Sequence, residues 1–307
     1  VTISQYFSIK LETSYNTTFA TERVMLETPL TTPASWHGVL KITYQNRYNR
    51  TQPIAPYAQA PYKLQRSFYP QGQAICYTTI VHTAGGIVGG DQLSQSIQLQ
   101  PETHAVITTA AASKIYRSKT LTASQTVNID VGENACLDYL PRETIVFNGA
   151  QYQQQLQVNL ASTATFFGWE IIRFGRSARG EQFLQGNWRS RTEIWQDGQL
   201  LWVDCPWLTG DKTILDSPHG LGGYPLVGTL VWFGKPVPPE MITAIRNLWE
   251  EMETTGEAGT TALMSGLLCR YRGNSRAEVV NWFTTIWRLI RQFDGKETPV
   301  TPRVWQV

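Results

Sequence analysis

The sequence predicts a mainly β protein, a single domain of stacked or layered β-sheets with two helices near its C-terminus. Three observations lead to this prediction. Short apolar runs separated by Gly, Pro, Asn and Asp follow one another from about residue 36 to residue 233. Aromatic residues make up 11% of the chain, and together with frequent Thr, Val and Gln they suit pleated surfaces. Helical periodicity occurs twice, both times after residue 238.

The chain begins with a segment whose composition differs from the rest. Residues 1–34 are rich in Thr and Ser and contain Pro29 and Pro33 near their end, which predicts an N-terminal extension. Residues 35–307 then form one β domain, since no repeat of fixed period divides them. With 307 residues, 42% hydrophobic and 16% charged, the chain can bury a sizeable core and is too apolar for disorder.

The strands are predicted from alternating and continuous apolar runs. Residues 36–44 alternate as a half-buried strand does. Further strands are expected at residues 105–109, 126–131, 153–160, 165–174, 189–195 and 198–205. The Asp197-Gly198 pair between the last two runs favours a tight hairpin turn, so these two strands should be antiparallel neighbours.

Two helices are predicted at about residues 239–252 and 276–292. Pro239 and Glu240 are well placed for the start of the first helix. Ser275 and Glu278 form a capping-box pattern at the start of the second. The apolar residues of the second helix recur at steps of three and four, so one face should pack against the β-sheets.

Charge and targeting signals restrict the partners. A formal net charge of +2 argues against a general affinity for nucleic acid or for an anionic membrane. We find no signal-peptide pattern and no apolar run that could cross a bilayer, and therefore expect a cytoplasmic protein. Five arginines nevertheless lie within residues 173–191. A structural arginine face, an acidic protein partner and phosphate contacts are three alternatives for them.

No motif predicts an active site, and the chain is not expected to be an enzyme. The glycine-rich string at residues 85–91 lacks the context of a protease N-terminus or a dinucleotide-binding loop, and a tight turn with close backbone approach is the simpler interpretation. Residues 210–213 lack the Gly-Lys pair and the upstream glycine of a phosphate loop. The four histidines and four cysteines are scattered without zinc-ligand spacing, and the cysteines lie in apolar stretches that favour burial.

Single carboxylates do occur inside apolar runs, at Asp91, Glu143, Glu170 and Asp204. A buried carboxylate without partners costs several kcal/mol, so each needs a cation, hydrogen-bond donors or water. Ordinary internal ion pairing is one interpretation. The other is a polar track for a hydrated divalent cation, because oxygen ligands that bind weakly suit transit better than storage.

Strand alternation predicts the surroundings of two of these acids. If residues 165–174 alternate, Glu170 shares a face with Phe166, Ile172 and Phe174. By the same rule, Asp204 shares a face with Leu200 and Trp202.

Several strings, taken together and in order, resemble the UreD (UreH) family of urease accessory proteins. They are HTAGGIVGGD at 82–91, TTAAASKIYR at 108–117, LDYLPRETI at 137–145 and FGRSARGE at 174–181, with RSFYP at 66–70 and WRSR at 188–191. The resemblance covers about residues 36–235. It extends more loosely to the predicted helices and has no counterpart for residues 1–34.

The resemblance implies a non-catalytic scaffold of stacked β-sheets with two helices. It implies assembly with UreF, recruitment of the GTPase UreG and docking on apo-urease, where the complex supports nickel insertion and carbamylation of the active-site lysine. It also implies a polar internal passage, with nickel as cargo in transit and no tightly bound cofactor. The helical region after Pro238 is expected to form part of the UreF contact.

The resemblance further implies roles for individual residues. Transient nickel contacts are expected at Asp91, Glu170 and Asp204. Residues expected to line the passage are Ser113 and, as secondary candidates, Glu143 and Glu181.

Two alternatives from other classes remain. A Trp-rich β-module that binds carbohydrate or another small ligand would expose coplanar tryptophans, whereas burial of Trp36, Trp169, Trp188 and Trp202 would disfavour it. A hydrolase with paired carboxylates would need two acids about 5–10 Å apart in an open cleft.

Overall fold

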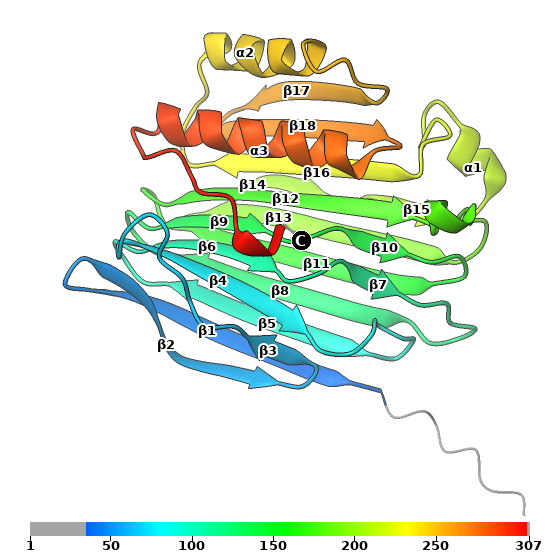
Figure 1. Ribbon diagram of the computed structural model, residues 1–307, viewed down its shortest axis with the longest axis horizontal. Coiled ribbons are helices and arrows are strands. Elements are labelled where there is room, and N and C mark those ends of the chain that lie inside the picture. Colours follow the sequence, from blue (N-terminus) through cyan, green and yellow to red (C-terminus); the bar gives the residue numbers. More distant parts are fainter. Residues whose placement is uncertain (1–34, 306–307) are drawn as a thin grey trace, which may run out of the picture. The chain divides into compact units, whose positions relative to one another are not determined.

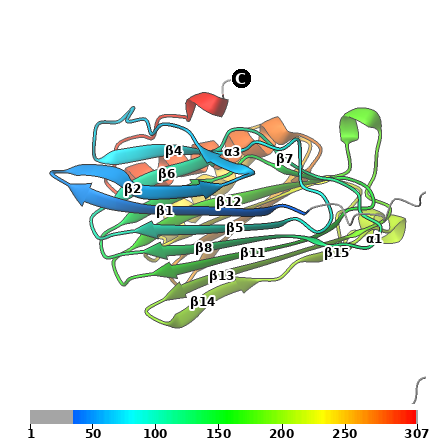
Figure 2. The same ribbon diagram turned by 90° about the horizontal axis from the view of Figure 1, so that it is seen from below.

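The structure, a computed structural model, describes residues 35–305. In this part of the chain two large β-sheets pack face to face, and helices cover the outer face of one of them (Figures 1 and 2). The predicted class, layered β-sheets with a helical pair near the C-terminus, is confirmed. The predicted extension, residues 1–34, lies outside the described residues. No helix within residues 35–305 is long and apolar enough to cross a membrane.

The eight-stranded sheet has the order β14-β13-β11-β8-β5-β1-β2, and β15 also pairs with β13. Its inner strands are parallel to one another, whereas β2, β14 and β15 pair antiparallel at the edges. Figure 2 shows these strands side by side. The strands are β1 (His37–Arg47), β2 (Arg50–Gln59), β5 (Gln92–Leu99), β8 (Ala123–Val131), β11 (Gln151–Leu160), β13 (Asn187–Gln196), β14 (Gln199–Asp204) and β15 (Trp207–Thr209).

The ten-stranded sheet has the order β17-β18-β16-β12-β9-β6-β4-β3, with β10 joining β12 to β7. Strands β4, β6, β9 and β12 are parallel neighbours, and β16, β18 and β17 continue the sheet antiparallel. The strands are β3 (Tyr62–Leu64), β4 (Ile75–His82), β6 (His104–Thr109), β7 (Ser113–Ile115), β9 (Cys136–Leu140), β10 (Thr144–Val146), β12 (Thr165–Phe174), β16 (Leu226–Phe233), β17 (Glu257–Leu263) and β18 (Gly266–Gly273).

The chain alternates between the two sheets over most of its length. Strands β4, β6, β9 and β12 belong to the ten-stranded sheet, and β5, β8, β11 and β13 between and after them belong to the eight-stranded sheet. Each return to a sheet adds a parallel strand beside the previous one. Parallel pairing therefore arises from long connections through the opposite sheet, as parallel strands require.

Two apolar cores separate the layers. One fills the space between the sheets, and the other lies between the ten-stranded sheet and the helices. Strand β12 contributes to both, because its side chains alternate. Phe166, Ile172 and Phe174 belong to the inter-sheet core, whereas Phe167 and Trp169 belong to the helix-side core. The predicted alternation of this strand is confirmed, and it directs Glu170 toward the inter-sheet space.

The helices are α1 (Lys212–Asp216), α2 (Pro239–Glu250) and α3 (Arg276–Phe293), with short 3-10 turns η1 (Ser177–Arg179) and η2 (Arg303–Trp305). Both predicted helices are confirmed. Pro239 occupies the first position of α2, and the Ser275 side chain accepts a hydrogen bond from the Glu278 backbone N–H at the start of α3. Figure 1 shows α3 across β16 and β18, and α2 beside β17.

The structure also shows the predicted hairpin turn, two elements that were not predicted, and the positions of the cysteines. The Asp197-Gly198 turn joins antiparallel strands β13 and β14, and both residues have positive φ, as a tight hairpin turn needs. The β17–β18 hairpin between the two helices was not predicted, because β17 is rich in Gly, Ala and Thr and gives a weak apolar pattern. Helix α1 is too short for periodicity. Burial of the cysteines is confirmed at three positions, but Cys205 is exposed and that expectation was wrong.

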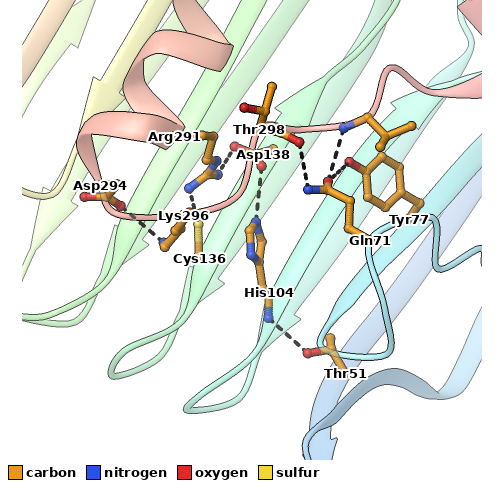
Figure 3. A network of polar contacts seen from close by, with 11 residues as sticks. Thr51, Gln71, Tyr77, His104, Cys136, Asp138, Arg291, Asp294, Lys296 and Thr298 are labelled. Carbon is orange, nitrogen blue, oxygen red and sulfur yellow. Dashed lines mark hydrogen bonds and ion pairs between the residues drawn. The ribbon is translucent and has the colours of Figure 1, made fainter.

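A buried ionic network ties α3 to the ten-stranded sheet (Figure 3). The Arg291 guanidinium donates hydrogen bonds to the Asp138 carboxylate and, at 2.7 Å, to the Cys136 Sγ. The side chains of Arg291 and Asp138 are only 2% and 1% exposed. His104 Nε2 lies 3.3 Å from the other Asp138 oxygen. Burial would raise the pKa of Asp138, but the Arg291 charge and the His104 hydrogen bond outweigh it and lower that pKa.

Removal of one member of this network should destabilise the fold strongly. Arg291→Met leaves Asp138 buried without its cation, and we expect a loss of about 3–5 kcal/mol in the free energy of unfolding at neutral pH. Because the pKa of Asp138 is lowered, this contribution is present above the carboxyl's ordinary pKa and is lost as the pH falls through its lowered value. Urea unfolding followed by tryptophan fluorescence measures it.

Lys212→Met is the control for this measurement, since the Lys212–Asp216 pair is exposed at the surface. Its unfolding midpoint should match that of the unchanged protein. A similarly small effect of Arg291→Met would show that the network does not hold α3 in place.

Candidate functional site

An inner cavity of about 270 Å³ lies between the two sheets and brings three of the predicted residues together. Ser113, Glu170 and Asp204 all line it. The cavity extends to the loops at 84–86 and 110–114, where Gly85 and Lys114 are exposed. One end of the inner cavity is therefore formed by the glycine-rich string and the segment that follows β6.

The eight-stranded sheet contributes a polar wall to this cavity. Its parallel strands bring side chains at matching positions onto the same face. Gln125, Gln154 and Ser190 occupy matching positions on β8, β11 and β13, and all three line the cavity. Two further lining atoms, His82 Nε2 and Gln95 Oε1, are buried without a hydrogen-bond partner among the described residues. The cavity thus offers amide, hydroxyl, imidazole and carboxylate groups within an apolar core.

A second, outer cavity of about 440 Å³ adjoins the first. Glu170 and Thr229 line both cavities. The outer cavity is lined from both sheets and includes exposed residues such as Trp207 and Gly259. The inner cavity lies toward the glycine-rich end of the sandwich and the outer cavity toward β15 and β17, and Glu170 and Thr229 lie between them, at what we call the junction.

Glu170 lies on β12 and receives a hydrogen bond from the Gln154 side-chain amide, which also donates to Ser190 Oγ at 3.1 Å. Burial and the nearby Asp204 charge raise the pKa of Glu170 to about 7, although Arg270 and these hydrogen bonds act in the opposite direction. Near neutral pH this carboxyl therefore exchanges between its protonated and ionised forms. A cation that enters the junction would favour the ionised form.

Asp204 ends β14 and meets the opposite sheet through an ion pair. Its Oδ2 lies 2.8 Å from Nη1 of Arg270, and the same nitrogen donates to Thr229 Oγ1 at 2.7 Å. The Asp204 side chain is 22% exposed and that of Arg270 is 43% exposed. The pair is therefore partly exposed to solvent.

The sequences of known proteins show which family this chain belongs to. A profile of the family described as UreD urease accessory protein matches residues 37–306. The chain belongs to this family. A urease accessory protein UreD from a Nostoc species is 56% identical over 271 residues, which cover 88% of this chain and 96% of the relative. The proteins of the same name from Nostoc punctiforme and a Synechocystis species are 54% and 40% identical, over 89% and 84% of this chain and 96% of each relative.

The family match includes the C-terminal helices as well as the β-rich part. The resemblance of the sequence strings to UreD is thereby confirmed and extended beyond residue 235.

Asp91, which the family resemblance placed on the passage, does not line either cavity. Its carboxylate oxygens accept hydrogen bonds from the backbone N–H groups of Trp36 at 2.8 Å and Val88 at 2.9 Å. Asp91 thus holds the glycine-rich string against the start of β1. Its role as a nickel contact remains a prediction.

Glu143 and Glu181 also lie outside the residues that line the two cavities. Glu143 pairs with Arg276 at 2.5 Å, at the start of α3. Glu181 pairs with Arg176 and accepts the backbone N–H of Asn148 at 2.7 Å. Internal pairing, the alternative interpretation given for such acids, describes the contacts of both residues, and their role along the passage remains a prediction.

The glycine-rich string makes the predicted close approach. A Cβ atom on Gly86 would lie 2.3 Å from the Tyr116 ring, and one on Gly89 would lie 2.1 Å from Ser118 Oγ. Gly90 has a φ of +95°, which favours glycine. These contacts fix the string against residues 114–121.

The predicted neighbours of Asp204 were partly wrong. Register along β13 and β14 shifts between Ile194 and Trp195, so that one extra residue is accommodated in β14. Such a bulge interrupts alternation. Trp202 packs against the inter-sheet core as expected, but Leu200 is exposed and does not share the face of Asp204.

Thr229, Arg270, Gln154 and Ser190 were not predicted as site residues. They reach the junction through cross-strand pairing, which a single sequence does not reveal. Four of the five arginines of residues 173–191 contact neighbouring side chains, which favours the structural alternative for these four. These contacts are Arg173 with Ser177, Arg176 with Glu181, Arg189 over the Trp207 ring and Arg191 with Glu193. Within residues 35–305 no group of three or more His, Cys, Asp and Glu side chains could hold a metal ion.

The raised pKa of Glu170 predicts a measurable pH dependence of stability. A carboxyl whose pKa is raised from 4.5 to about 7 stabilises the fold fully only at acidic pH, and that contribution is lost as the pH rises through 7. Glu170→Gln should therefore gain stability relative to the unchanged protein between pH 5 and pH 8, by at most about 3 kcal/mol. Thermal or urea unfolding across this pH range measures the difference.

Glu257→Gln serves as the control, because Glu257 is an exposed carboxylate at the outer cavity. It measures the effect of the same substitution on stability at an exposed position. Equal pH profiles for Glu170→Gln and the unchanged protein would exclude a raised Glu170 pKa.

Proposed function

We propose that the protein acts in urease maturation as a scaffold that passes nickel through its inter-sheet cavities. Membership of the UreD family makes it an accessory protein of urease and not a catalytic enzyme. The observation that carries the passage is the junction of two cavities at Glu170 and Thr229, with Asp204 beside it. Carboxylate and hydroxyl oxygens bind a divalent cation without the tight hold of thiolates, which suits a transient contact.

We propose that the two ends of this passage serve two different partners. Exposed residues line the inner cavity at the loops 84–86 and 110–114, and exposed residues line the outer cavity near β15 and β17. We propose that the protein assembles with UreF, that UreG supplies nickel, and that the complex docks on apo-urease in the cytoplasm. The helical region that begins at α2 is our candidate for part of the UreF contact, because α2 lies at the outer edge of the helix layer (Figure 1).

No observation favours the carbohydrate-binding alternative. Trp169 and Trp188 are buried, and Trp202 packs against the inter-sheet core. Trp36 is exposed at 44%, and Trp207 is stacked beneath Arg189 at 4.0 Å, so the exposed tryptophans do not share one bare platform. An aromatic platform for sugars would need such a shared surface.

Assembly is the first test of this proposal. The tagged full-length chain, expressed together with UreF and the urease subunits of the same organism, should retain both partners through affinity purification and size-exclusion chromatography. An unrelated tagged protein expressed in its place gives the background. Absence of both partners under these conditions would remove the scaffold role.

Nickel transfer is the second test. Asp204→Asn and Glu170→Gln remove charge from the junction while preserving side-chain shape, so each should lower the nickel content of matured urease several-fold while the complex still assembles. Asp216→Asn, on the exposed helix α1, is the matched control and should leave nickel content unchanged. Metal analysis of purified urease measures the outcome, and normal loading in the double variant would reject the passage. Asp91→Ala is unsuitable, because it would disturb the backbone around the glycine-rich string.

A further inference from the structure

A polar row crosses the ten-stranded sheet at the junction of the two cavities. Glu170 on β12 is paired in register with Thr229 on β16, which is paired with Arg270 on β18. Asp204 reaches the same place from the opposite sheet. The register places Glu170, Thr229 and Arg270 side by side, and the ion pair with Arg270 brings Asp204 to them.

Arg270 binds the oxygen atoms that a passing cation would bind. One guanidinium nitrogen, Nη1, contacts both Asp204 Oδ2 at 2.8 Å and Thr229 Oγ1 at 2.7 Å. Thr229 lines both cavities and Asp204 lines the inner one, so both oxygens are at the junction or beside it. A divalent ion at the junction and the guanidinium in this position would compete for the same oxygens.

We propose that Arg270 is an internal counter-ion that competes with the cation cargo for Asp204 and Thr229, so that the cargo binds weakly and is released. This inference rests on the proposed passage of nickel. In the empty state Arg270 neutralises Asp204. When a divalent cation arrives the guanidinium withdraws, and it returns as the cation leaves.

The fold leaves room for this withdrawal. The residue paired with Arg270 on the edge strand β17 is Gly259. A Cβ atom built on Gly259 would meet nothing within 4 Å, so open space lies over this strand position next to Arg270. The outer cavity of about 440 Å³ is lined by both residues, and Arg270 is already 43% exposed. A long, flexible arginine can move into that space without any change in the backbone.

The charges at the junction favour a divalent cargo over a monovalent one. With Arg270 withdrawn, ionised Asp204 and Glu170 carry two negative charges, which a divalent ion balances. A monovalent ion would replace the guanidinium with no gain in charge and would lose its directed hydrogen bonds. Exchange of Arg270 for a divalent ion is therefore favoured over exchange for a monovalent ion.

The outer cavity supplies a matched control. Arg272 lies two residues further along β18, lines the same outer cavity and pairs with Glu257 at 2.7 Å. It is not among the residues that line the inner cavity. Arg272→Met thus removes the same charge and the same side chain from the cavity, but not from the junction.

The experiment is an equilibrium titration of the chain with nickel chloride at pH 7.5, in which calorimetry measures the binding. Arg270→Met should bind nickel about fivefold more tightly than the unchanged protein, the factor expected when one competing half-exposed ion pair is removed. Arg272→Met should bind as the unchanged protein does. The double variant Asp204→Asn with Arg270→Met should lose the gain, because the contested carboxylate is absent.

A second substitution should act in the opposite direction. Gly259→Val fills the space beside Arg270, and since valine suits a strand and its Cβ meets no atom, the fold should be retained. Nickel binding should weaken, because the guanidinium cannot withdraw. Arg270→Lys keeps the positive charge and should stay close to the unchanged protein.

Two results would overturn the counter-ion role. One is nickel binding by Arg270→Met that is no tighter than in the unchanged protein, with circular dichroism showing a folded chain. The other is an equal gain in Arg272→Met, which would indicate a general charge effect. If Glu170→Gln and Asp204→Asn lower the nickel content of urease but Arg270→Met binds normally, the passage stands and only the counter-ion role fails.

Discussion

The register between neighbouring strands determines which side chains meet in this protein. Because the chain passes alternately through two sheets, each sheet grows by parallel neighbours whose side chains fall into rows across it. One such row joins Gln125, Gln154 and Ser190. A second row, which joins Glu170, Thr229 and Arg270, crosses the antiparallel strands β12, β16 and β18. Polar residues that are scattered in sequence thus become continuous walls, and the cavities between the sheets follow from the stacking of these walls.

Polar walls within an apolar core require that most of their groups find partners, since an unpaired buried group is costly. Gln154 meets this need by donating to both Glu170 and Ser190, and Arg270 does so for Asp204 and Thr229. These contacts offset part of the cost of burying the polar groups that line the cavities. The apolar residues around them, such as Phe166 and Leu156, keep the sheets together on either side.

The sequence was informative where structure follows from local pattern. Alternation along β12 correctly directed Glu170 between the sheets, and the caps at Pro239 and Ser275 located both helices. Local pattern failed at β14, where a bulge separates Leu200 from Asp204. It could not predict Thr229 or Arg270 at the junction, because their neighbours belong to strands distant in sequence. Family strings located the region of Asp91 but not its contacts, since motif position does not show whether an acid holds the backbone or faces a cavity.

Two arginine–aspartate pairs, each with one residue on the ten-stranded sheet, show how the surroundings decide what an ion pair does. Arg291 and Asp138 are enclosed between α3 and the sheet, and His104 and Cys136 lie against them. If the two charges separated, water could not hydrate either of them. Asp204 and Arg270 border a cavity and lie beside the open space at Gly259. Their charges can separate into solvent or exchange for another ion at a modest cost. The enclosed pair fixes a helix, whereas the pair at the cavity retains the freedom that a passage for ions requires.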